Sequence, residues 1–90
     1  MNCIAEYLRD NSSTDKPVLS KELQQHFHVD GRQVRRSVHD ARCNGVPICI
    51  SDDGYFYSED DADIRRTMLT LESRSREISE AAEGLRRLLE

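Results

Sequence analysis

An unbroken apolar periodicity in the last third of the chain limits its possible folds more than any other feature. Between residues 60 and 90 there is no proline and a single glycine, Gly84. Apolar or small side chains recur there at alternating spacings of four and three, the pattern of a coiled-coil core. We call these eight residues the seam: Ile64, Met68, Leu71, Ser75, Ile78, Ala82, Leu85 and Leu89. The pattern predicts one long helix from Asp60 to Glu90.

This helix is expected to pair with a second copy. At a rise of 1.5 Å per residue it would be roughly 45 Å long, which exceeds the compact part of so small a domain. Folding back over its own domain is the alternative, but a small domain cannot cover six large apolar seam residues. The flanking charges show no code that separates parallel from antiparallel pairing. The expected homodimer contacts are Ile64, Met68, Leu71, Ile78, Ala82, Leu85 and Leu89.

Length and composition exclude several classes of protein. A chain of 90 residues has material for one core, which excludes a multidomain enzyme, and we expect a domain at residues 1–58 followed by the helix at 59–90. No apolar run reaches the ~20 residues that span a bilayer, and no secretory signal is recognisable, so we expect neither a membrane nor a secreted protein. Cysteines at 3, 43 and 49 without a CxxC pair favour the reducing cytoplasm.

The first half of the chain is predicted to contain three short helices. Ile4, Tyr7 and Leu8 have helical spacing within Cys3–Arg9, and the polar residues 11–15 end that helix. Residues 17–19 form a brief extended stretch. Ser20 is a suitable N-cap for a second helix, Lys21–Phe27.

The third helix and the segment after it carry the clearest local signals. Asp30, with Gln33 three residues later, has capping-box spacing for a helix from Gly31 to about Cys43 that buries a stripe of Val34, Val38 and Ala41. Apolar runs at 47–51 and 55–58 flank the Asp52-Asp53-Gly54 turn, which predicts a two-stranded hairpin. The fold class expected is α+β.

The face of the third helix opposite its buried stripe is cationic. Residues 31–42 carry four arginines and one aspartate in a chain with a net charge of −4. We call Arg32, Arg35, Arg36 and His39 the basic face. Arginine binds phosphate or the edge of guanine bidentately, and glutamine can pair with adenine. A solvated helix face is the alternative interpretation.

A helix, a tight turn, a helix and a hairpin in this order describe a winged helix-turn-helix. Ser20 to Tyr57 resembles the winged-helix domain of the biotin-operon-repressor type, closely over somewhat less than half of the chain. The features that match are the two-helix pair, the Arg-x-x-Gly-Val-Pro-Ile passage at 42–48 and the Gly54-Tyr55 pair. Small regulatory proteins of bacteriophages and mobile elements carry this module with a helical tail.

The resemblance implies that the chain binds double-stranded DNA with its third helix in the major groove. Residues at the start of such a helix contact bases, so Arg32, Gln33 and Arg36 are expected to read base edges. Lys21, Arg35 and His39 are the expected phosphate contacts. The function expected is sequence-selective DNA binding as a dimer, for transcriptional regulation.

The hairpin tip departs from that pattern, because Asp52 and Asp53 would be repelled by phosphates. We expect the hairpin to be structural, although an acidic tip also suits a protein partner. The rival functions are therefore a protein-interaction module and an architectural or recombination accessory factor. His26 and His28 do not face each other and no zinc-type cysteine pair exists, so no metal, cofactor or enzymatic activity is predicted.

Overall fold

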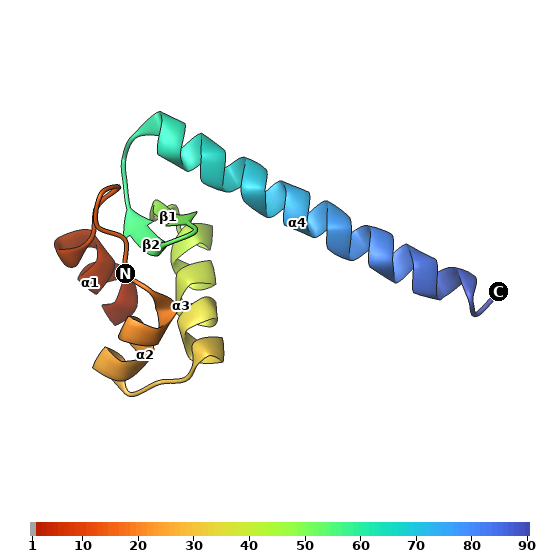
Figure 1. Cartoon of the computed structure of the whole chain (residues 1–90), viewed down its shortest axis with the longest axis horizontal. Helices are drawn as coiled ribbons and strands as arrows, with labels where there is room; N and C mark the ends of the chain where they lie inside the picture. Colours follow the sequence, from red (N-terminus) through yellow and green to blue (C-terminus); the bar gives the residue numbers. More distant parts are fainter. Residues whose placement is uncertain (1) are drawn as a thin grey trace.

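The computed structural model describes residues 2–90 and is α+β, as predicted (Figure 1). Three short helices come first: α1 (Cys3–Asn11), α2 (Ser20–Phe27) and α3 (Gly31–Cys43). A two-stranded antiparallel sheet of β1 (Ile48–Ser51) and β2 (Gly54–Tyr57) follows them. The long helix α4 (Asp61–Arg87) then leaves the top of the domain and extends past the side of α3 that faces away from α1 (Figure 1).

The core lies between the three short helices and the sheet. The predicted stripe of α3 is buried, and it packs on aliphatic side chains from α1, α2 and β1. Because the chain has no tryptophan, these aliphatic contacts supply most of the apolar burial. The fully or nearly buried apolar residues are Ile4, Ala5, Leu8, Val18, Leu23, Val34, Val38, Ala41, Ile48, Cys49 and Phe56.

Three predicted helix ends were wrong. Helix α4 ends at Arg87 and not at Glu90. Helix α1 continues to Asn11, two residues beyond the expected end. Ser20 is not an N-cap but the first residue of α2, and Leu19 at the cap position makes no side-chain cap hydrogen bond. The Ser20 hydroxyl instead accepts a hydrogen bond from the Gln24 amide, at 3.2 Å.

Both ends of α3 are fixed by local hydrogen bonds. The predicted capping box is confirmed, since the Asp30 carboxylate accepts from the backbone N–H of Gln33 and the side-chain oxygen of Gln33 accepts from the backbone N–H of Asp30. At the other end Gly45 has a φ of 81°, and the N–H of Val46 donates to the carbonyl of Ala41. This is a Schellman motif, which ends the helix and turns the chain toward β1.

Gly54 has a different role from the one that the Asp-Gly pattern predicted. The two turn residues are Asp52 and Asp53, and Gly54 is the first residue of β2, paired with Ser51. Its φ is 130°, and a Cβ added to it would lie 2.4 Å from the Val18 carbonyl oxygen. Val18 approaches so closely because it exchanges two backbone hydrogen bonds with Tyr55, which adds a one-residue bridge to the free edge of β2.

Helix α4 is attached to the domain by two buried polar side chains. The Asp63 carboxylate accepts hydrogen bonds from Thr14, at 2.9 Å, and from Ser58, at 2.8 Å. The Thr67 hydroxyl accepts from the Ile50 N–H at 3.2 Å and thereby satisfies a donor on the outer edge of β1. Hydrogen bonds therefore link the proposed 1–58 domain to the first two turns of α4.

Within residues 2–90, none of the helices combines the length and the apolar character that crossing a bilayer requires.

Gly54→Ala is expected to destabilise the fold more than Gly45→Ala. Both glycines have positive φ, which costs a non-glycine residue about 1–2 kcal/mol. A Cβ at Gly45 meets no atom within 4 Å, whereas a Cβ at Gly54 would push Val18 off β2. Urea unfolding of the two variants measures the difference, and equal losses of stability would show that the close approach of Val18 is unimportant.

Asp63→Asn is expected to cost stability at neutral pH and little in acid. Hydrogen bonds from Ser58 and Thr14, with help from Arg66, lower the pKa of Asp63 below its usual range. A lowered folded-state pKa stabilises the protein above the ordinary aspartate pKa, and this contribution disappears as the pH falls below about 4. Melting temperatures between pH 3 and 7 test this, with Asp61→Asn as the exposed control. A constant difference from wild type across that range would contradict the prediction.

Candidate nucleic-acid interface on helix α3

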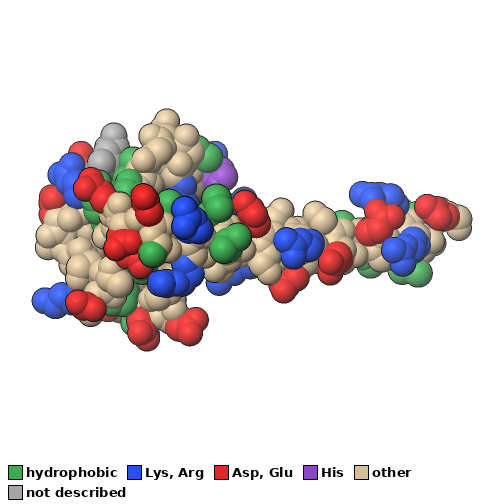
Figure 2. All heavy atoms as spheres, turned by 90° about the horizontal axis from the view of Figure 1, so that it is seen from above, with side chains coloured by type: hydrophobic (Ala, Val, Ile, Leu, Met, Phe, Trp, Pro, Cys, Tyr) green, Lys and Arg blue, Asp and Glu red, His purple; other side chains and the backbone are tan. Residues whose placement is uncertain are grey.

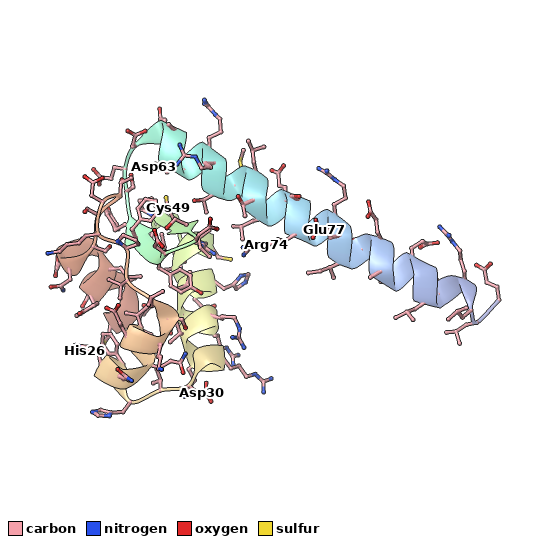
Figure 3. The ribbon with its side chains drawn as sticks, in the orientation of Figure 1. His26, Asp30, Cys49, Asp63, Arg74 and Glu77 are labelled. Carbon is pink, nitrogen blue, oxygen red and sulfur yellow. The ribbon has the colours of Figure 1, made fainter. Side chains whose placement is uncertain are left out.

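All four side chains of the basic face are exposed on the same side of α3. Nitrogen-tipped side chains project there, away from α1 and α2 (Figure 3). The placement follows from the helix period, because Arg32, Arg36 and His39 lie on the opposite side from the buried stripe. The structure thus places these residues together on one face, as the sequence predicted.

None of the three ion pairs found among residues 2–90 involves an arginine of the basic face. Arg35 folds back toward the turn between α2 and α3, where its guanidinium lies 3.4 Å from the position of a Cβ on Gly31. The His39 ring nitrogen lies 3.5 Å from the Cys43 sulfur, one turn further along the same face. The basic face therefore carries three arginines without an ion pair among residues 2–90, Arg32 and Arg36 at its centre and Arg35 at its flank.

The other two predicted contacts have distinct surroundings. Lys21 is exposed in the first turn of α2, on a different helix from the basic face. Gln33 is exposed too, but its side-chain oxygen accepts from the Asp30 N–H at 3.0 Å. Its amide nitrogen remains available as a donor. Bidentate pairing with adenine requires both groups, so Gln33 would have to give up the capping bond for that contact.

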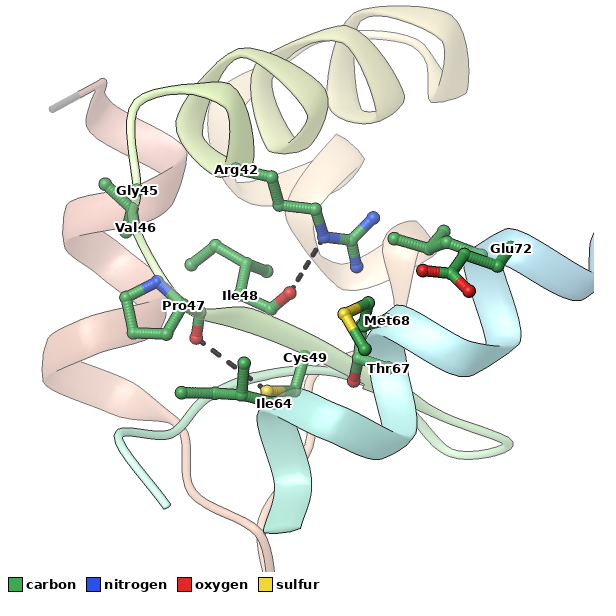
Figure 4. Close-up of a pocket in the computed structure, with 11 residues that line it drawn as sticks. Arg42, Gly45, Val46, Pro47, Ile48, Cys49, Ile64, Thr67, Met68 and Glu72 are labelled. Atoms are coloured by element: carbon green, nitrogen blue, oxygen red, sulfur yellow. Dashed lines mark hydrogen bonds between the residues drawn. The ribbon is translucent and has the colours of Figure 1, made fainter. Parts of the chain in front are cut away.

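The fourth arginine of α3 is structural. Arg42 is half-buried and its Nε donates to the Ile48 carbonyl at 2.8 Å, which braces the turn from α3 to β1 (Figure 4). Its Nη2 is the one buried side-chain polar atom without a hydrogen-bond partner among the described residues. Burial lowers the pKa of this guanidinium, and the charge of Arg74 lowers it further. The Arg-x-x-Gly-Val-Pro-Ile passage therefore has a structural role, because its first residue, Arg42, donates a hydrogen bond to the carbonyl of its last, Ile48.

Arg74 is a cation near the site that sequence reasoning missed. It extends from α4 toward the domain (Figure 3), close enough to affect Arg42. Local periodicity gave no signal for this contact, because the direction of α4 depends on the Asp63 and Thr67 hydrogen bonds. The turn residues Asp52 and Asp53 are exposed at the hairpin tip, as predicted.

The seam is exposed along its whole length. The residues of α4 that its own domain buries are Asp63 and Thr67, which the seam does not include. The helix does not fold back, since every residue from 71 onward is exposed. Side chains of both charges alternate along this projecting part with apolar patches between them (Figure 2).

Cysteine and histidine side chains form no metal-binding cluster in the part of the chain that the structure describes. Cys49 is buried, and burial raises the pKa of its thiol. Cys3 and Cys43 are exposed free thiols.

Comparison of the chain with protein families, curated proteins and solved structures gives no match.

Gln33→Glu is expected to keep the stability of α3, whereas Gln33→Ala should lose about 1 kcal/mol. Glutamate can accept the same hydrogen bond from the Asp30 N–H, and its charge favours the first turn of a helix. Thermal unfolding of both variants measures the contribution of the capping box. Equal melting temperatures for the two variants would show that this side chain does not stabilise the helix.

Proposed function

We propose that this chain is a winged helix-turn-helix protein that binds double-stranded DNA as a homodimer and regulates transcription. The observation that carries the proposal is the basic face of α3, which is exposed and free of ion pairs within residues 2–90. On an ordinary solvated helix face, arginines commonly pair with acidic side chains three or four positions away. Unpaired arginines on one exposed face suit a polyanion.

The arrangement of elements supports the fold part of the proposal. Helices α2 and α3 contact each other across a tight turn, and the hairpin follows directly. The Val18 bridge makes a third, one-residue strand beside β2, in the place that a winged helix gives to its first strand. In this fold the outer side of the second helix of the pair enters the major groove.

Each side chain then has a role by its position. Arg32 and Arg36 stand in the first half of α3, where a recognition helix meets base edges, and each can bond to guanine bidentately. Gln33 contributes one donor from its amide while its oxygen stays in the capping box. Arg35, His39 and Lys21 lie at the margins and bind phosphates.

Two further parts of the proposal rest on the seam and on the cysteines. The exposed seam joins two copies, and the joint binding of two sites multiplies a weak single contact. Free cysteines suit the cytoplasm, where a regulator meets DNA. The chemistry proposed for the basic face is binding alone, with no catalytic step and no cofactor.

Arg32→Ala combined with Arg36→Ala is expected to weaken DNA binding by roughly 30-fold or more, because each lost base contact is worth about 1–3 kcal/mol. Fluorescence anisotropy with labelled genomic duplex fragments at two salt concentrations measures this. Wild-type affinity should fall as salt rises, since phosphate contacts release counterions. The matched control is Arg76→Ala with Arg87→Ala, which removes the same charge from exposed positions of α4.

Three outcomes are informative. Selective loss of binding in the α3 variant supports the proposal. Equal loss in both double variants would mean that net charge, and not α3, governs binding. If the wild type does not bind at low salt, the DNA proposal is wrong, and the exposed Asp52-Asp53 tip becomes the place to seek a protein partner.

A further inference from the structure

An apolar groove of about 430 Å³ lies between the seam side of the first turns of α4 and the domain (Figure 4). One wall is the first part of the seam, Ile64, Met68 and Leu71, and the other is the turn from α3 to β1, which includes Val46 and Pro47. A helix laid on the seam would therefore also close this groove. A segment that fills the groove must therefore present apolar side chains to Met68 and its neighbours.

The C-terminal end of α4 and the turn that follows it have such an apolar surface. Leu85 is 66% exposed, Leu88 is 78% exposed and Leu89 is 89% exposed. Leu88 is the C-cap residue of α4 and keeps helical backbone angles. It does not belong to the seam, and its position three heptads after Thr67 places it on the flank that carries Asp63 and Thr67, the two α4 residues that the domain buries. A leucine on that flank needs a partner surface beside the seam, and the groove is one.

The order of large and small residues in the seam decides the direction of pairing. In parallel pairing, Ser75 would face the partner's Ser75 and Ala82 the partner's Ala82, which leaves two underpacked layers. In antiparallel pairing, one register places each small residue opposite a large one and uses all eight positions. A shift of one heptad either way leaves two seam residues of each chain unpaired. The layers of this register are Ile64 with the partner's Leu89, Met68 with the partner's Leu85, Leu71 with the partner's Ala82, and Ser75 with the partner's Ile78.

We infer that the groove and the seam are covered by α4 of a second copy, running antiparallel in this register. The partner's Leu88 then lies beside Thr67 and enters the groove against Val46 and Pro47. This inference deepens the dimer part of the proposed function and does not depend on DNA contact.

The register also fixes the spacing of the two domains. Each domain is attached to its own α4 at Asp63 and Thr67. In the antiparallel register the two attachment regions are roughly 35 Å apart along the helix axis. Two helix-turn-helix half-sites one turn of DNA apart have a centre-to-centre spacing of about 34–36 Å. In a parallel dimer the attachments would face each other at about 8–10 Å.

Disulfide cross-linking distinguishes the two directions. In full-length protein with Cys3→Ser and Cys43→Ser, where the buried Cys49 is kept, one variant carries Met68→Cys and another Leu85→Cys. After mild oxidation the antiparallel register should give covalent dimer from the mixture of the two variants and almost none from either alone. Leu71→Cys mixed with Ala82→Cys tests a second layer, which covers the case in which the first pair does not fold.

Leu69→Cys is the matched control, because it is 55% exposed, next to Met68 and outside the seam. It should not cross-link with Leu85→Cys. Cross-linking of Met68→Cys alone would show parallel pairing and overturn the inference. A monomer in light scattering, or a dimer in which neither mixture cross-links, would overturn it as well. The DNA assay reports separately, so cross-linking without DNA binding would refute the proposed function and leave the antiparallel dimer standing.

Discussion

The carboxylate of Asp63 fixes the geometry on which the rest of the molecule depends. It joins Thr14 from the α1–α2 loop, Ser58 after β2 and the first turn of α4. Because this anchor and Thr67 determine which flank of α4 is buried, they also determine which flank is left for a partner. The hydrogen bonds of Asp63 and Thr67 turn their flank of α4 toward the domain, and this orientation leaves the seam exposed.

The same anchor relates the tail to the basic face. Helix α4 leaves over β1 and extends past the outer side of α3, so Arg74 is directed toward the domain (Figure 3). Arg42 occupies the junction, bonded to the Ile48 carbonyl and in the field of Arg74. The junction between the domain and α4 therefore combines an apolar groove with the half-buried guanidinium of Arg42.

Sequence reasoning succeeded where interactions are local. The helix period placed Arg32, Arg36 and His39 outward, and the capping box of Asp30 and Gln33 depends on residues three apart. It failed where partners are distant along the chain. Asp63 meets Thr14 49 positions away, and Gly54 is constrained by Val18, so neither contact leaves a periodic signal.

The distribution of charge explains how an acidic chain could approach DNA. Helix α4 has six acidic and six basic side chains, so the tail is neutral as a whole. The acidic excess is concentrated at the hairpin tip, Asp52 and Asp53, and just before α4, at Glu59 and Asp60. Screening limits exposed charges to about 8 Å at physiological salt, so a phosphate at α3 responds to the arginines beside it and not to the net charge of −4. Under the proposed function, the acidic tip would repel any orientation that brings the hairpin onto the DNA backbone, and α3 would be the element that faces the major groove of DNA.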